Sequence, residues 1–298
     1  MTTATLPSVG SLLAAAAGAL RASGSPTPRL DAELLIAHAT GRERAWVLAH
    51  PESEISANAV EVLRNGLERR ATGEPIAYIR GFKEWLSLRI RTDARALVPR
   101  PETEVLAAAA MAEVAGRLDR DGEPVVAWEV ATGSGAVAVA LALRFREALE
   151  AGPLTLIASD ASADALALAA ENVADHGVER LLRLVAADLL APAGVTLPRP
   201  DVVVANLPYL STAEVETAAG SLAHEPRVAL EGGPEGLELL RRLFSELPDR
   251  AAAGATVLLE VALGQAAAVA GLSPLGAAVE TLPDLGGVPR VVVVRLPS

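Results

Sequence analysis

Residues 125–135 read VVAWEVATGSG and join an apolar run to a glycine turn. The pattern predicts a buried strand at residues 125–131 and a helix at residues 135–149. Small residues at such a turn let a ligand approach the backbone, and the helix that follows offers free N–H groups. Two glycines also occur in strand-to-helix turns that serve packing alone. By itself, therefore, the motif fits a ligand site and a packing turn about equally well.

The same alternation of strand and helix continues to the end of the chain. A second helix is predicted at residues 162–176, and further strands at residues 154–158, 182–186, 201–205, 256–261 and 291–294. Alternation of this kind predicts an α/β domain with a parallel sheet and helices on both of its faces.

The first seventy residues have a different, purely helical pattern. Apolar side chains recur at helical spacing within residues 30–38 and again within residues 57–70, and Thr72-Gly73 ends the second run. Short strands are then predicted at residues 76–78 and 86–90, around a turn near Gly81. We predict a helical domain at residues 1–73, a β-hairpin connector at 74–97 and the α/β domain at 98–298.

Composition excludes several classes of protein. The chain has no cysteine, so it forms neither disulfides nor thiolate metal sites, and we expect no metal. The apolar residues 11–20 have no positive charge before them, as a signal peptide would, and no run suits a membrane span. The net charge is −11 with Lys83 as the single lysine, which argues against direct nucleic-acid binding. We expect a soluble, cytoplasmic monomer.

Two aspartates follow successive predicted strands. Asp160 comes 25 residues after Gly135, where a carboxylate accepts hydrogen bonds from both ribose hydroxyls of a nucleoside. Asp188 ends the third strand and would lie near the adenine ring. Helix capping or a turn is the structural alternative for both residues. This placement indicates a nucleoside across the strand ends, without separating NAD from S-adenosylmethionine.

Directly after the strand at 201–205 stands the tetrapeptide Asn206-Leu207-Pro208-Tyr209. A side-chain amide is a poor nucleophile with two N–H donors, so a site that methylates it needs two acceptors in its plane and a flat wall above it. The Asn206 side-chain oxygen and the Leu207 carbonyl can be those acceptors, while Pro208 stiffens the turn and Tyr209 stacks on the amide. An ordinary strand-ending turn is the alternative, but the position beside a nucleoside site favours function.

These motifs together resemble the HemK/PrmC group, the protein-(glutamine-N5) methyltransferases that modify peptide-chain release factors. The most specific segment is the run PRPETE at residues 99–104. The other matching segments are residues 30–35 (LDAELL), 69–70 (RR), 74–81 (EPIAYIRG), 224–237 (HEPRVALEGGPEGL), 259–265 (LEVALGQ) and 283–292 (PDLGGVPRVV). The resemblance therefore covers nearly the whole chain, in order.

The resemblance implies a seven-stranded class I methyltransferase domain with S-adenosylmethionine as methyl donor. It implies that Asn206, Leu207, Pro208 and Tyr209 hold the substrate glutamine, with Asn206 also beside the cofactor. The partner it implies is a class I release factor, modified in its Gly-Gly-Gln loop. Because the helical domain is a separate unit with no cofactor-binding features, we predict that it recognises this partner. The residues it assigns to the cofactor are Ala131, Thr132, Gly133, Ser134 and Gly135 for the methionine part, Asp160 for the ribose, and Asp188 and Leu189 for the adenine.

The chain departs from the family pattern at two positions. Ala131 stands where the family usually has glycine, and Leu207 where it has proline. The same tetrapeptide is typical of rRNA adenine dimethyltransferases. The alternatives are thus a diverged paralogue, a nucleic-acid adenine-N6 methyltransferase, and a non-enzymatic interaction protein. We assign no general base, and residues 102–104 either line the cleft or simply start a helix.

Overall fold

The computed structural model describes residues 6–298, apart from the side chain of Asp121. The chain forms two compact units. One comprises the residues up to Phe82 together with Ala218–His224, and the other comprises Lys83–Thr217 with Glu225–Ser298. A short segment from the second half of the chain therefore belongs to the N-terminal unit.

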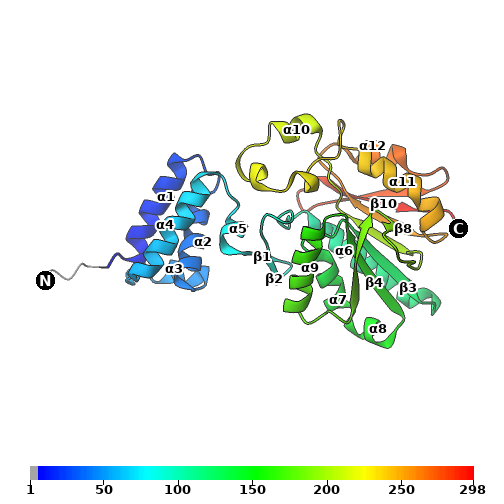
Figure 1. Cartoon of the computed structure of the whole chain (residues 1–298), viewed down its shortest axis with the longest axis horizontal. Coiled ribbons are helices and arrows are strands. Elements are labelled where there is room, and N and C mark those ends of the chain that lie inside the picture. The colour runs from blue at the N-terminus through cyan, green and yellow to red at the C-terminus, as the bar shows by residue number, and fades with distance from the viewer. Residues whose placement is uncertain (1–5) are drawn as a thin grey trace. The chain divides into compact units, whose positions relative to one another are not determined.

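The N-terminal unit is a helical bundle (Figure 1). Buried apolar side chains from α1, α2 and α4, such as Leu20, Leu35 and Leu63, form its core. Its helices are α1 (Val9–Ala22), α2 (Pro28–Thr40), α3 (Arg44–Ala49), α4 (Ala57–Ala71) and α5 (Ile76–Arg80). Ser8 and Ser56 cap α1 and α4 through their side chains.

The short helix α5 corrects the strand predicted at residues 76–78. Pro75 stands at its N-cap with φ −56°, and Gly81 ends it in the left-handed region with φ 77°. Ile79 is buried in the bundle core, against which Ile76 packs from the preceding turn. The spacing of three residues between Ile76 and Ile79 places both on one face of a helix, so packing on the bundle outweighs the strand preference of this segment.

A β-hairpin follows, formed by β1 (Phe82–Trp85) and β2 (Leu88–Arg91). Its two turn residues, Leu86 and Ser87, both have positive φ, as a tight hairpin turn requires. The buried Asn172 of α9 (Ala163–Asp175) accepts from the Arg91 N–H at 2.7 Å and donates to the Ser134 carbonyl at 2.8 Å. The hairpin is thus tied to the glycine turn.

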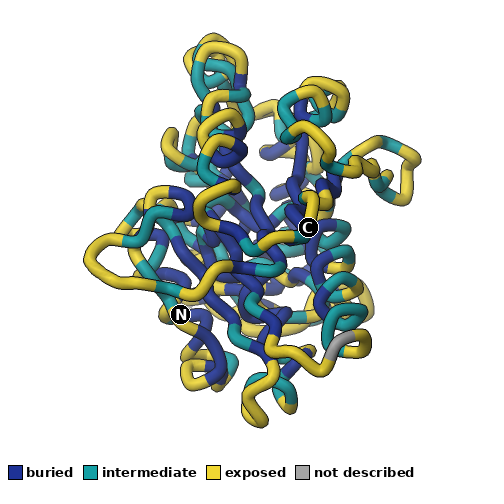
Figure 2. Tube along the Cα trace, turned by 90° about the vertical axis from the view of Figure 1, so that its right-hand side faces the viewer, coloured by how far each residue is buried: buried dark blue, intermediate teal, exposed yellow. Residues whose placement is uncertain are grey.

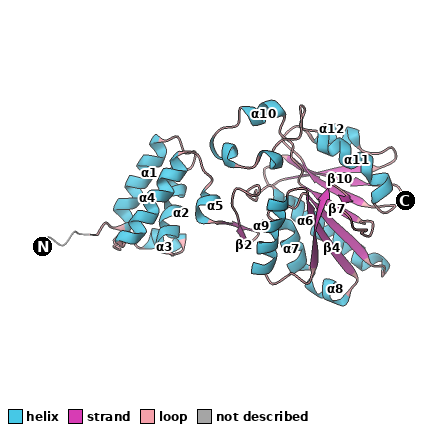
Figure 3. Cartoon of the chain, viewed as in Figure 1, coloured by secondary structure: helices cyan, strands magenta, loops and turns pink. Residues whose placement is uncertain are grey.

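The second unit contains a twisted sheet with the strand order β6-β5-β4-β3-β7-β8-β10-β9 (Figure 3). Its strands are β3 (Val125–Val130), β4 (Leu154–Asp160), β5 (Leu182–Asp188), β6 (Ala191–Pro192), β7 (Val202–Ala205), β8 (Thr256–Glu260), β9 (Ala278–Pro283) and β10 (Pro289–Arg295). Seven full strands and the two-residue β6 confirm the seven-stranded prediction.

The sheet is parallel from β5 to β8, as predicted, and antiparallel at its C-terminal side. β10 runs antiparallel to both β8 and β9. Asp284 accepts from the N–H groups of Gly286 and Val288, which makes the tight turn that sends the chain straight back. β9 itself was not predicted, because it is an edge strand with mostly exposed residues and shows no apolar run.

Helices cover both faces of this sheet, as predicted. Successive β7 residues alternate between two cores, with Val202 and Val204 in one and Val203 and Ala205 in the other. The first core includes α6 (Thr103–Asp121), α7 (Ala136–Arg144) and α9 (Ala163–Asp175), and the second includes α11 (Glu238–Arg250) and α12 (Ala266–Leu272). The helix predicted at residues 135–149 ends at Arg144, and α8 (Arg146–Ala151) follows it.

Nearly all residues of the central strands β3, β4, β7 and β8 are buried, and the interior of the tube in Figure 2 is correspondingly dark blue. The loops beyond the strand ends contain α10 (Thr212–Glu216) and the 3-10 helices η1 (Gly220–His224) and η2 (Arg227–Ala229). Among residues 6–298, no helix is long and apolar enough to cross a membrane.

Candidate active site

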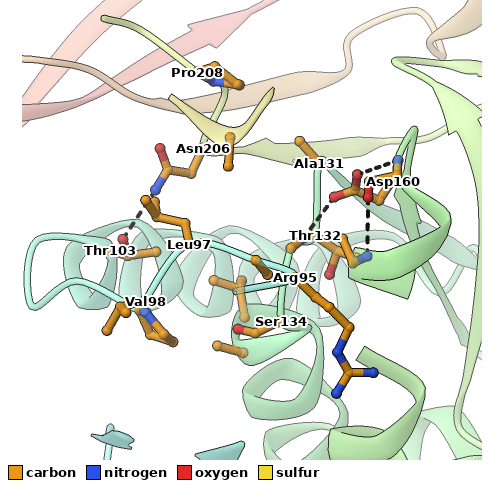
Figure 4. A pocket seen from close by; sticks show the side chains of 18 of the residues that line it. Arg95, Leu97, Val98, Thr103, Ala131, Thr132, Ser134, Asp160, Asn206 and Pro208 are labelled. Carbon is orange, nitrogen blue, oxygen red and sulfur yellow. Dashed lines mark hydrogen bonds between the residues drawn. The ribbon is translucent and has the colours of Figure 1, made fainter. Parts of the chain in front are cut away.

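A cavity of the second unit lies where β3, β4 and β7 end, at their carboxyl ends (Figure 4). It is lined on one side by the turn after β3 and by Asp160, and on the other by Asn206 and Pro208. Further walls come from Arg95, Ala96, Leu97, Val98, Pro99, Arg100, Thr103, Val228 and Ala229. Ligands of open α/β sheets bind at this edge.

The turn after β3 owes its shape to three positive φ angles, 56° at Ala131, 57° at Gly133 and 78° at Gly135. A Cβ at Gly135 would lie 3.1 Å from the Ala169 Cβ, so glycine lets the turn pack on α9. Ala131 adopts the same left-handed conformation with a side chain, at a cost of roughly 1–2 kcal/mol. The backbone shape therefore survives the replacement of the usual glycine.

Asp160 is fixed by the glycine turn and by its own strand end. Its two carboxylate oxygens accept from the Gly133 N–H and the Ser162 N–H, both at 2.9 Å. Burial raises the pKa of this carboxyl, and the backbone hydrogen bonds oppose the rise. Ser162, and not Asp160, caps α9 through its side chain. A carboxylate has about four acceptor positions, so Asp160 can still accept from a ribose hydroxyl.

Glu129 is a cavity residue that the sequence analysis missed. It lies in β3, is only 5% exposed, and accepts from the Thr132 hydroxyl at 2.6 Å. Burial raises its pKa to about 8. A carboxyl in this environment would be ionised by a neighbouring cation, such as the ammonium group of a bound amino acid. The sequence feature that could have revealed Glu129 is that it is the single charged residue within an apolar predicted strand.

Asp188 and Leu189 lie at the end of β5, outside the residues that line the cavity. Asp188 is exposed and pairs with Arg242 at 2.6 Å. Leu189 has φ 54° and packs in the core beneath α11. Their assignment to the adenine stays a prediction.

The residues of the tetrapeptide after β7 have different surroundings, because some line the cavity and another packs in the core. Asn206 and Pro208 line the cavity, and the Asn206 Nδ2 donates to the Thr103 hydroxyl at 3.3 Å (Figure 4). Leu207 is 2% exposed and packs in the core. The pKa of Tyr209 is raised by burial, and its carbonyl accepts from Gln265 Nε2 at 3.0 Å.

The backbone of a glycine-rich loop, residues 231–236, packs directly against the backbone of this tetrapeptide. The Leu210 N–H donates to the Leu230 carbonyl at 2.9 Å, and the Gly232 N–H donates to the Leu210 carbonyl at 2.8 Å. A Cβ at Gly232 would overlap the Pro208 carbonyl oxygen, and one at Gly236 would overlap that of Tyr209. The segment EGGPEG is therefore required by close backbone approach, which the sequence alone did not reveal.

Glu225 is a second residue that the sequence analysis did not single out. Its buried carboxylate accepts from the Val98 N–H at 3.0 Å and forms an ion pair with Arg100. It thereby joins the segment at 97–100 to the segment at 225–229, and both line the cavity.

Residues 102–104 have three separate roles. Only Thr103 lines the cavity. Glu102 stands at the N-cap of α6 and lies 3.9 Å from Arg290, while Glu104 accepts from the Leu86 N–H at 3.3 Å. No cluster of metal-ligating side chains occurs among the residues that the structure describes.

The strand order and the cavity at the strand ends are those of the class I methyltransferase fold, the fold of S-adenosylmethionine-dependent enzymes. A crystal structure of a methyltransferase from Pyrococcus furiosus has the same fold, with a TM-score of 0.50 at 19% identity, covering 78% of this chain and 99% of that one. The glycine turn, Asp160 and Glu129 together suit the cofactor's sugar and its charged amino-acid end.

Comparisons of sequence identify the family. Residues 11–81 match the family described as the PrmC N-terminal domain. The chain is 38% identical to the release factor glutamine methyltransferase of Deinococcus radiodurans, over 95% of this chain and 97% of that protein. It is 35% identical to that of Xylella fastidiosa strain Temecula1, over 98% and 100%. The chain belongs to the release factor glutamine methyltransferase family, which confirms the resemblance drawn from its motifs.

Proposed function

We propose that this enzyme methylates the side-chain nitrogen N5 of the glutamine in the Gly-Gly-Gln loop of class I peptide-chain release factors. The family supports a release-factor substrate, because the relatives named above act on release factors. The loop and the class of factor come from the resemblance of the motifs. A net charge of −11 argues against the nucleic-acid alternative.

One observation carries the proposal: the glycine turn and two residues of the tetrapeptide, Asn206 and Pro208, line a single cavity. A nucleoside cofactor held by Asp160 and a planar amide held by Asn206 would therefore share one chamber. Bound S-adenosylmethionine supplies an electrophilic methyl group on its sulfonium. The protein's part is to orient the two reactants, which removes much of the entropic barrier.

We propose roles for the residues of the tetrapeptide in binding the amide. The Asn206 Oδ1 and the Leu207 carbonyl accept the two N–H groups of the substrate amide, and the Tyr209 ring stacks on its plane. Pro208, which lines the cavity, stiffens the turn. The acceptors favour the positive charge that develops on the nitrogen as the methyl group leaves the sulfonium. The methylated nitrogen is acidic and then loses one proton to water. Glu129 holds the cofactor's ammonium group, and residues 131–135 hold the rest of its methionine part.

The proposal places the protein in the cytoplasm, as a monomer, where it meets release factors. Recombinant class I release factor should gain a single methyl group, 14 Da, on the loop glutamine when incubated with the enzyme and S-adenosylmethionine. Peptide mass spectrometry locates the modification, and a factor with asparagine in place of that glutamine is the matched control. A loop that stays unmodified while another protein in a lysate becomes labelled would contradict the proposal and favour a diverged paralogue.

A further inference from the structure

A buried carboxylate lies behind Asn206, outside the cavity lining. Glu260 ends β8, is 3% exposed, and belongs to none of the cavity walls. β7 and β8 run parallel with Ala205 paired to Leu259, so Asn206 and Glu260 leave the sheet side by side. Its Oε2 is buried without a hydrogen-bond partner among the described residues. A polar group in this position requires an explanation.

Two side chains that line the cavity, Thr103 and Asn206, lie near this carboxylate. Burial raises the pKa of Glu260 to about 7, and interactions with these two side chains oppose the rise. The Asn206 Nδ2 also donates to the Thr103 hydroxyl at 3.3 Å. The three residues come from three separate elements, α6, the end of β7 and β8, and form one polar cluster.

The chemistry of a carboxylate decides how the asparagine amide is turned. An ionised carboxylate only accepts hydrogen bonds, so it attracts the Nδ2 side of Asn206 and repels the Oδ1 side. The Asn206 Nδ2 donates to the Thr103 hydroxyl, and Figure 4 shows the Oδ1 on the opposite side of the amide. The reverse orientation would place an NH₂ group toward the substrate.

We infer that Glu260 and Thr103 are positioning residues that lock the Asn206 amide with its oxygen toward the substrate and thereby select glutamine over glutamate. The inference rests on the proposed function. A glutamine offers N–H donors to that oxygen, whereas the isosteric glutamate offers only oxygens when ionised. A site built to accept from an N–H strongly rejects the analogue that lacks it.

Protonation of Glu260 releases the lock. The neutral acid can donate to the Asn206 Oδ1, so both orientations of the amide become available below about pH 7. The other charged or titratable groups that act on Glu260 are Glu102 at the start of α6, Arg290 on β10 and Tyr209 after β7. The Tyr209 pKa lies above its usual value, so the phenol does not titrate in this range.

The kinetic test compares Glu260→Gln and Thr103→Val with the conservative Thr103→Ser. We expect the first two to lower kcat on a release factor about 10- to 100-fold, by analogy with the loss of hydrogen-bond partners that orient metal ligands. Thr103→Ser should retain most of the rate, and cofactor affinity should stay within twofold in all three. A release factor with glutamate in the loop should inhibit Glu260→Gln more strongly than wild type. Wild-type kcat and unchanged inhibition in Glu260→Gln would overturn the inference.

The pH profile provides a readout that a merely structural role would not move. At saturating cofactor, the wild-type rate should rise through about pH 7, and Glu260→Gln should lack this limb. Because the Glu129 carboxyl has a pKa of about 8, the difference between the two profiles is the relevant measurement. Identical profiles would overturn the inference.

A spectroscopic measurement tests the lock without any activity. The chain has four asparagines and one glutamine, so its ¹⁵N spectrum contains five side-chain amide pairs, and the pair lost in Asn206→Ser is that of Asn206. We expect this pair to shift with a midpoint near pH 7 in wild type and not in Glu260→Gln. A pair that does not titrate would overturn the lock. A pair that titrates in an enzyme inactive on release factors would sustain the lock and refute the proposed substrate.

Discussion

At the scale of single residues, the site depends on buried polar groups whose partners come from different elements. Asn206 illustrates this, because β7 places it and Thr103 of α6 binds its amide. Asn206→Ala removes one acceptor from a desolvated site, so we expect kcat to fall on the order of 10²-fold or more with little change in cofactor affinity. Single-turnover rates and calorimetry measure the two quantities.

Leu207→Pro is the matched control for that substitution. It retains the backbone carbonyl and restores the residue usual in the family, so it should keep most of the activity unless its N–H is needed in the turn. Equal and severe losses in both variants would show that the shape of the turn, and not the asparagine oxygen, limits the reaction. A nearly normal Asn206→Ala enzyme would refute the amide-binding role.

Glu129 makes stability depend on pH. Burial raises its pKa from 4.5 to about 8, so between these values the folded protein binds more protons than the unfolded chain. The free energy of unfolding therefore falls as pH rises through this window. Without added cofactor, Glu129→Gln should abolish this pH-dependent decrease in the free energy of unfolding, which is on the order of a few kcal/mol.

Thermal denaturation between pH 5 and pH 9 measures the effect. The Tm of Glu129→Gln relative to wild type should increase steadily with pH. Asp160→Asn serves for comparison, because the pKa of Asp160 is also raised by burial but its carboxylate receives backbone hydrogen bonds. A constant difference in Tm between Glu129→Gln and wild type would show that Glu129 does not titrate in this range.

At the scale of elements, the tetrapeptide keeps its shape because a neighbouring loop contacts its backbone. Gly236 has φ 70°, and a Cβ there would overlap the Tyr209 carbonyl oxygen. Gly236→Ala should therefore cost more than about 2 kcal/mol of stability and lower activity, because it combines backbone strain with displacement of the loop.

Gly276→Ala is the matched control, since Gly276 has φ 86° and open space around it. That variant should show backbone strain alone, about 1 kcal/mol, and normal activity. Chemical denaturation and single-turnover rates distinguish the two cases. Similar losses of stability in both variants would show that the close approach at Gly236 is unimportant.

At the scale of the whole molecule, the N-terminal unit is completed by a segment from beyond the tetrapeptide. Within that unit, the Nε2 of His224 in this segment lies 2.9 Å from the Thr72 carbonyl oxygen. Arg70 donates to the Ser221 hydroxyl of the same segment and to the carbonyls of Gly73 and Glu74. The segment Ala218–His224 therefore depends on the helical bundle for its partners. We propose that the bundle recognises the release factor.

A chain that begins at Lys83, with Ala218–His224 replaced by a flexible linker, tests this role. It should bind S-adenosylmethionine as the full chain does, because every residue that lines the cavity lies in the second unit. It should methylate an intact release factor at least tenfold more slowly at subsaturating factor. Full activity on the intact factor would refute recognition by the bundle, and loss of cofactor binding would show that the unit does not fold alone.

The sequence alone determined the features that depend on neighbouring residues. Apolar runs and the glycine turn predicted β3 and its helix, and Asn206 at the end of β7 predicted the site, because these patterns follow from local periodicity. The matching segments identified the family because each of them is a short contiguous stretch of sequence. The tertiary structure decided which distant side chains meet. Glu129 is buried beside the turn, Asp188 pairs with Arg242, and Glu260 lies beside Asn206 at the ends of the neighbouring strands β8 and β7. Such contacts depend on strand order and register, which no local pattern encodes.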